Sequence, residues 1–136
     1  MHFCLVDQVL ERSADRVVAI KTVTIAEEYL QDHFPSFPVL PGVFMLEALV
    51  QTGRELLAGR GCGRVVLGRV KGLKYGSFVR AGDTLRMEVS FDRETEGGWQ
   101  LKGAATVIRF GDAAPDTACT GRLIMRPVRI PAPIGS

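Results

Sequence analysis

The chain after Gly63 has the pattern of β-strands joined by tight turns, and one of its runs alternates between polar and apolar residues as a half-buried strand does. The clearest run is Thr84 to Arg93, where Leu85, Met87, Val89 and Phe91 share one face. Other β-prone runs are residues 16–25, 64–75, 99–110 and 117–125. Residues 3–10 form an apolar lead-in and residues 11–15 a polar turn.

Residues 41–58 predict one long helix, which ends at a cluster of glycines. Apolar side chains surround most of its circumference, so we expect it to be buried on nearly all sides. Glu47 lies in its middle, and because burial of an unpaired carboxylate is costly, we expect it to be paired or protonated. Gln51 lies one turn later and can hydrogen-bond to it.

The segment before this helix is stiff and carries a histidine. Prolines 35, 38 and 41 restrict their own φ angles and those of the preceding residues, so the segment can hold His33 in one place. Leu40, at the expected N-cap, offers no capping side chain, and the first turn carries no acid. Gly42 lets another molecule approach the free N–H groups, so this helix start suits a partial negative charge.

The order of these elements is one strand, one helix and then four strands, which predicts an α+β domain. The economical arrangement curls one antiparallel sheet around the helix. So small a sheet cannot cover the helix alone, so we expect a homodimer that continues the sheet. Residues 126–136, rich in proline, are expected to be an extended tail of this single domain, residues 1–136.

Composition narrows the possible functions. The 136 residues suit one domain, 46% of them are hydrophobic, and the net charge of +2 is too small to indicate nucleic-acid binding. Three cysteines without motif spacing fit a reducing cytoplasm, and no signal peptide or membrane span is evident. With only His2 and His33 and no HxxxH or CxxC spacing, we expect no metal site.

Two stretches of the central segment resemble a known family. Residues 33–43 read His-Phe-Pro-Ser-Phe-Pro-Val-Leu-Pro-Gly-Val, and residues 47–51 read Glu-Ala-Leu-Val-Gln. They are similar to the signature of the β-hydroxyacyl-acyl-carrier-protein dehydratases of type II fatty acid synthesis, which have the hotdog fold. Residues 3–11, 20–25 and 82–85 also resemble family segments. A related dehydratase/isomerase branch has Asp where this chain has Glu47, which favours the plain dehydratase.

The resemblance implies a role for each residue of the motif. His33 would take the α-proton of a 3-hydroxyacyl thioester, and Glu47 would help the hydroxyl leave as water. The backbone N–H of Gly42, with that of Val43, would bind the thioester carbonyl, and Gln51 would orient Glu47. The substrate would be an acyl chain on the phosphopantetheine of acyl carrier protein. The active site would lie between two subunits of a dimer, dimers form trimers in many relatives, and no cofactor would be required.

These roles agree with the chemistry of the residue types. Neutral histidine is a base near working pH, and prealigned N–H donors stabilise charge that grows on a thioester oxygen. A carboxyl group in an apolar environment can supply the proton for the departing hydroxide.

The chain departs from the family pattern at Asp32 and Ser36, where glycines are usual. Residues 74–83 also lack two arginines and two prolines of the corresponding family segment. The cations nearby are Lys71, Lys74, Arg80 and Arg126. They could form a basic patch that replaces the missing arginines, or they could be ordinary solvated surface charges. Two alternatives to the dehydratase are a thioesterase on the same scaffold and a non-catalytic acyl-binding module.

Overall fold

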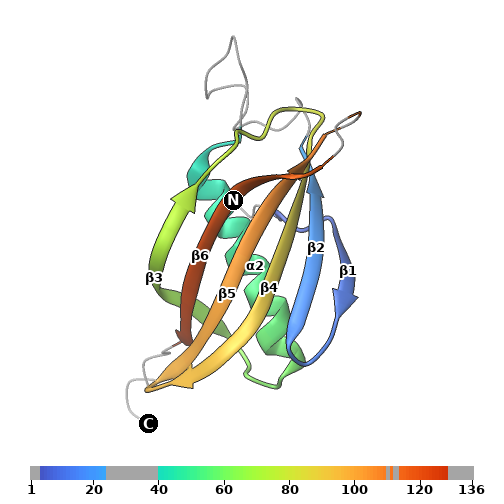
Figure 1. Ribbon diagram of the computed structural model, residues 1–136. Helices are drawn as coiled ribbons and strands as arrows, with labels where there is room; N and C mark the ends of the chain where they lie inside the picture. Colours follow the sequence, from blue (N-terminus) through green and yellow to red (C-terminus); the bar gives the residue numbers. More distant parts are fainter. Residues whose placement is uncertain (1–3, 24–39, 110, 112–113, 129–136) are drawn as a thin grey trace, which may run out of the picture.

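The computed structural model describes residues 4–23, 40–109, 111 and 114–128. Six strands form one antiparallel sheet in the order β1-β2-β4-β5-β6-β3, and the helix α2, Gly42–Gly59, lies across one face of it (Figure 1). The strands are β1 Gln8–Arg12, β2 Arg16–Thr22, β3 Val65–Tyr75, β4 Thr84–Thr95, β5 Gly98–Ile108 and β6 Asp116–Pro127. The predicted α+β architecture of one curled sheet and a long helix is confirmed.

The core lies between α2 and the face of the sheet that the alternation predicted. Leu85, Met87 and Val89 of β4 are fully buried there, and Phe91 packs against the same cluster. The helix places eight residues against the sheet: Met45, Ala48, Leu49, Val50, Thr52, Gly53, Leu56 and Leu57. Thr52, the polar member, donates its hydroxyl to the carbonyl of Ala48 at 2.9 Å, so burial leaves it satisfied.

β3 forms one edge of the sheet and is irregular where its glycines predicted. The pairing with β6 shifts between Leu67 and Arg69 and again between Lys71 and Lys74. The second irregularity contains Gly72, whose φ of 61° favours glycine. Past these irregularities the last residue of β3, Tyr75, reaches the N-terminal end of α2, where its ring faces Gly42.

Several sequence-based expectations differ from the structure. The predicted polar turn at residues 11–15 is partly strand, since β1 ends at Arg12 and pairs with β2 through a bulge. The helix is fully buried only on the side toward the sheet, its other side is half-buried, and Val43 is 64% exposed. The physical reason is that the sheet of one chain reaches only one face of α2. β6 also continues to Pro127, two residues into the expected tail, because these residues pair with β3.

Candidate active site

The start of α2 is open in the way the sequence predicted. Pro41, not Leu40, is the N-cap residue, and it has no side-chain hydrogen bond to offer. Its carbonyl accepts from the N–H groups of Phe44 and Met45, at 2.9 and 3.3 Å, and the first turn carries no acid. The N–H groups of Gly42 and Val43 precede the first helical bonds, so an outside acceptor can use them.

Loop 76–83 and the end of β3 frame this helix start. The Leu40 N–H donates to the Val79 carbonyl at 2.7 Å, which ties the entrance of the helix to the loop. The Tyr75 ring stands so close to Gly42 that a β-carbon there would lie 3.0 Å from it. Burial, aided by neighbouring Cys119, raises the pKa of the Tyr75 phenol, so the ring keeps its hydroxyl proton at neutral pH. A side chain at position 42 would push the Tyr75 ring aside and crowd the helix start.

A polar stripe runs along the helix face that points away from the sheet. Glu47, Gln51 and Arg54 follow one another at spacings of four and three residues, which places them on one side of the helix. The Glu47 Oε1 accepts from Gln51 Nε2 and from Arg54 Nη1, each at 3.4 Å. The Glu47 side chain is 40% exposed, so the predicted pairing is present while the predicted burial is only partial in the single chain.

The amide of Gln51 is oriented from its other end. Its Oε1 accepts from the backbone N–H of Leu5 at 2.7 Å, so Nε2 is left to face Glu47. Arg54 is fixed in a similar way, because its Nε donates to the carbonyl of Val65 at 3.2 Å, at the start of β3. The stripe is thus anchored to the N-terminal segment and to the edge strand, and two of its members, Gln51 and Arg54, line a hollow of about 380 Å³ beside β1.

Of the five predicted site residues, the structure places four. Glu47 and Gln51 are brought together, Gly42 stands at the helix start, and Val43 next to it is exposed. His33, the predicted base, lies outside the described residues. Among the described residues there is no cluster of three or more metal-ligating side chains.

Two contributors to this site were not predicted. Arg54 could have been predicted, since it continues the spacing of Glu47 and Gln51 along one face of the helix. The N–H of Leu5 could not, because a backbone group 46 residues away from Gln51 has no sequence pattern. The helix start and the stripe together offer exposed N–H donors and a carboxyl held by two neighbours, which suits chemistry on a polar carbonyl compound.

Comparison with known proteins assigns this arrangement to a family. Residues 9–108 match the model of the ApeI-like family, described as ApeI dehydratase. A 3-hydroxyacyl-[acyl-carrier-protein] dehydratase FabZ of Roseiflexus sp. is 43% identical over 77% of this chain and 76% of the relative. The FabZ of Verminephrobacter eiseniae is 38% identical over 93% of this chain and 89% of its own length.

Solved structures agree on the fold. The dehydratase heterocomplex ApeI:P from Xenorhabdus doucetiae superposes with a TM-score of 0.69 at 18% identity, over 89% of this chain and 96% of that one. A hexameric thioesterase from Yersinia pestis gives 0.67 at 14% identity, over 81% and 89%. These likenesses confirm the hotdog architecture. The family match shows that the chain belongs to the ApeI-like dehydratase family, and along most of its length it is also similar to the FabZ dehydratases.

Proposed function

We propose that this protein dehydrates (3R)-3-hydroxyacyl thioesters carried by acyl carrier protein to trans-2-enoyl thioesters, in fatty acid or related lipid or polyketide biosynthesis. The observation that carries the proposal is the 38–43% identity to 3-hydroxyacyl-[acyl-carrier-protein] dehydratases over most of the chain. The geometry supports it, because the oriented carboxyl and the open helix start are the parts that such a reaction uses.

The reaction breaks a C–H bond next to the thioester and a C–O bond one carbon further on. His33 would accept the α-proton as general base. The charge that develops on the thioester oxygen would be met by the N–H groups of Gly42 and Val43, and removal of one such donor typically costs about 2.7–4 kcal/mol. Glu47 would give a proton to the departing hydroxyl, which leaves as water, and the C=C bond forms between the two carbons.

The contacts of Glu47 orient its carboxyl group. Gln51 and Arg54 both hold Oε1, while Oε2 receives no hydrogen bond from the rest of the described chain. Oε2 is therefore the oxygen that would carry the transferred proton. Gln51 is the predicted orienting residue, and Arg54 would share that task. The substrate would enter on this side of the helix.

A second copy of the chain would complete the site. The face of α2 that carries Glu47 and the 64%-exposed Val43 is only partly covered by the described chain. β3 stands at one edge of the sheet and could continue it into a partner. We therefore infer a homodimer in which His33 of one subunit serves Glu47 of the other, and three such dimers would form the larger assembly.

The substrate would be held on the phosphopantetheine arm of the carrier protein, and no metal or cofactor would take part. We place the reaction in the cytoplasm, and the free thiols of Cys4, Cys62 and Cys119 suit a reducing compartment. No helix in the described part of the chain has the length and hydropathy to cross a membrane.

The test is turnover of a 3-hydroxybutyryl thioester on acyl carrier protein by the wild-type chain, with His33→Ala and Glu47→Gln as controls. The expected result is an enoyl thioester with the carrier still attached, and strong loss in both variants. Release of free acid would instead show a thioesterase. Binding of the acyl carrier without turnover would show a non-catalytic module, and full activity of both variants would exclude the assigned roles.

A further inference from the structure

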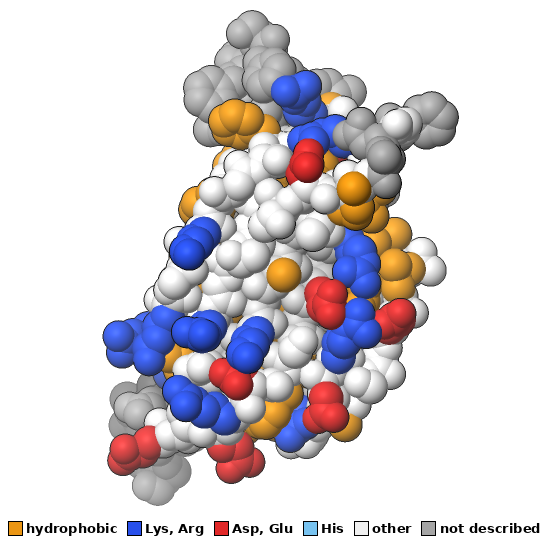
Figure 2. All heavy atoms as spheres, in the orientation of Figure 1, with side chains coloured by type: hydrophobic (Ala, Val, Ile, Leu, Met, Phe, Trp, Pro, Cys, Tyr) orange, Lys and Arg blue, Asp and Glu red, His pale blue; other side chains and the backbone are white. Residues whose placement is uncertain are grey.

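The outer face of the sheet, which points away from α2, has two regions of different charge. Over β2 and β4 cations and acids are matched, since Arg16 and Arg86 both pair with Glu88, at 2.6 and 3.1 Å. Over β3 and β6 Lys and Arg side chains dominate, toward the left and lower left of the molecule (Figure 2). The two strands contain one acid between them, Asp116 at an end, and Arg109 pairs with it at 3.0 Å.

The centre of this second region is a row of three cations on neighbouring strands. Lys71 of β3 stands opposite Arg122 of β6, and Arg122 stands opposite Lys102 of β5. Like charges directly opposite one another destabilise a sheet, so the row opposes folding. Only Lys102 has an acid near it, Asp92 at a distance of 4.0 Å. For the side chains of Lys71 and Arg122 the described residues supply no ion pair or hydrogen bond.

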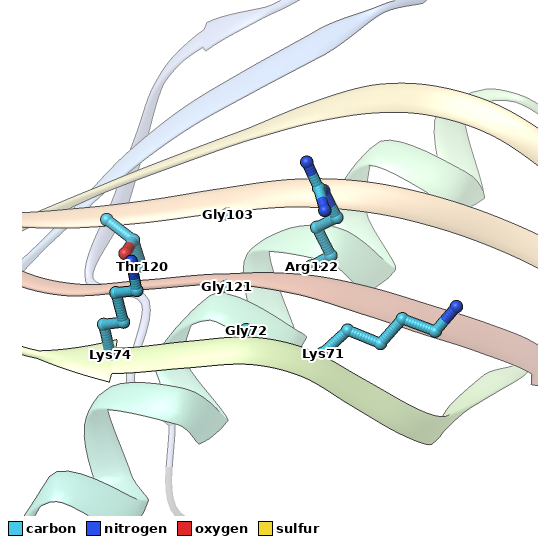
Figure 3. Close-up of a pocket in the computed structure, with 7 residues that line it drawn as sticks. All are labelled: Lys71, Gly72, Lys74, Gly103, Thr120, Gly121 and Arg122. Carbon is cyan, nitrogen blue, oxygen red and sulfur yellow. The ribbon is translucent and has the colours of Figure 1, made fainter.

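Further cations extend the row along both strands. The exposed residues Arg69, Lys74 and Arg126 belong to the same two strands. We call Arg69, Lys71, Lys74, Lys102, Arg122 and Arg126 the cationic face. Figure 3 shows Lys71, Lys74 and Arg122 around a shallow hollow of about 300 Å³, floored by Gly72, Gly103 and Gly121.

We propose that the cationic face is the docking surface for an acidic protein partner, and the proposed function identifies that partner as the acyl carrier protein. A partner with clustered carboxylates would neutralise the mutual repulsion of the row, so binding would relieve a cost that the free chain bears. The cations are spread over three strands, which fits a distributed charged surface better than one small anion.

The position of the cationic face suits delivery of a substrate to the site. Lys74 precedes Tyr75, the residue whose ring faces Gly42 at the start of α2. A partner bound on β3 and β6 would therefore stand beside the edge strand that leads to the helix start. The missing arginines of residues 74–83 would then be replaced by cations of the sheet surface. Of the four cations predicted as a substitute, Lys71, Lys74 and Arg126 lie in these strands, while Arg80 lies in the loop after them.

The experiment compares Lys71→Glu, Arg122→Glu and the matched control Arg93→Glu, an exposed cation near the β4–β5 hairpin. Binding of acyl carrier protein that bears no acyl group is titrated at several salt concentrations. We expect wild-type affinity to fall as salt rises, the first two variants to bind roughly tenfold more weakly at low salt, and the control to match wild type. Unchanged affinity of Arg122→Glu, or equal loss in Arg93→Glu, would overturn the proposal.

Two further arms separate docking from chemistry. The same 3-hydroxyacyl group is supplied on the carrier and on a short thiol, N-acetylcysteamine. In Lys71→Glu and Arg122→Glu we expect KM to rise for the carrier substrate only. An equal loss with both substrates would refute docking. If wild type turns over neither substrate, the proposed function fails while the carrier titration still decides the docking. Inorganic phosphate is titrated as well, and tight binding of phosphate without binding of the carrier would replace the protein partner by a small anion.

Folding of the variants is checked by their thermal unfolding. Because each reversal removes a like-charge pair, Lys71→Glu and Arg122→Glu should unfold at or above the wild-type temperature. A variant that binds weakly and also unfolds at a lower temperature is not evidence for docking. In that case the test is Lys71→Gln, which removes one charge without adding another. We expect its affinity for the carrier to lie between those of wild type and Lys71→Glu. Wild-type affinity in Lys71→Gln would overturn the proposal.

Discussion

The two sides of helix α2 differ in their burial and in the groups that they contact. On the side toward the sheet, Ala48, Leu49 and Thr52 are fully buried, and the single polar group among them is satisfied within the helix. On the other side Glu47 and Gln51 are partly exposed and contact groups from distant parts of the chain. The difference indicates that the buried side of the helix stabilises the fold, while the polar side serves the activity.

The polar side contributes little to stability. Its ion pair between Arg54 and Glu47 is long, at 3.4 Å, and both side chains are about two-fifths exposed. Exposed pairs of this kind contribute about 0–1 kcal/mol to the free energy of unfolding. A carboxyl that stabilises the fold so little, yet is held by two neighbours, is better explained by chemistry than by structure.

The largest effect is expected for Glu47→Gln, which keeps the shape of the side chain and removes its acid. We expect kcat to fall by about 10²–10⁴-fold, the usual contribution of general acid–base catalysis, with little change in the unfolding temperature. Dehydratase turnover and thermal unfolding are measured together. Glu55→Gln is the matched control, because Glu55 is eight residues along the same helix and pairs with Arg12 at 2.8 Å. Equal activity losses in both variants would remove the distinction between these two acids.

The next effect belongs to the buried side. Leu49→Ala removes a fully buried side chain that packs over Gly103 of β5. We expect the free energy of unfolding to fall by about 2–5 kcal/mol, since a cavity is left where the sheet cannot collapse onto the helix. Urea unfolding measures the change. Val43→Ala, on the exposed side, should cost under about 0.5 kcal/mol. A similar cost for both would mean that the two sides do not differ in the isolated chain.

The same contrast shows how much of the burial could be predicted from the sequence. Alternation identified the core face of β4 because Leu85, Met87 and Val89 follow the two-residue period of a strand that is buried on one side. The same reasoning overestimated the burial of the helix. A count of apolar residues around α2 cannot tell which of them meet the sheet and which, like Val43, are left exposed in one chain.

For the candidate site, local spacing was informative and distant contacts were not. The pair of Glu47 and Gln51 followed from one helical turn, and the open helix start followed from the absence of capping residues. The groups that orient the pair could not be found this way, since Leu5 and Val65 meet the helix only after the sheet has formed. β1 was missed because its residues, Gln8 to Arg12, are mostly exposed and lack an apolar alternation.

A smaller effect is expected at the polar side for Gln51→Leu. This change leaves the N–H of buried Leu5 without its acceptor, which should cost about 1–3 kcal/mol of unfolding free energy. It also releases Glu47 from one of its two neighbours, so kcat should fall while KM changes little. Gln51→Glu is the informative companion, because it restores an acceptor for Leu5 but no donor for Glu47. Recovery of stability without recovery of kcat is expected, and recovery of both would assign Gln51 a purely structural role.

The smallest effects come from two glycines of α2 that sharpen the comparison. An added β-carbon would lie 3.0 Å from its nearest neighbour at both Gly42 and Gly53, but the neighbours differ. Gly53 faces fully buried Leu101, whereas Gly42 faces Tyr75, which is 50% exposed and can turn aside. Gly53→Ala should therefore overpack the core, at a cost of about 1–3 kcal/mol that is offset by roughly 1 kcal/mol of helix propensity.

Gly42→Ala should leave stability almost unchanged, because the Tyr75 ring has solvent to move into. It should lower turnover instead, since the added methyl group and the displaced Tyr75 ring would crowd the helix start that a substrate carbonyl would approach. Thermal unfolding and kcat are measured for both glycine variants. If Gly42→Ala lost stability but kept full turnover, this glycine would be needed only for packing. The helix start would then not be the group that binds the developing oxyanion.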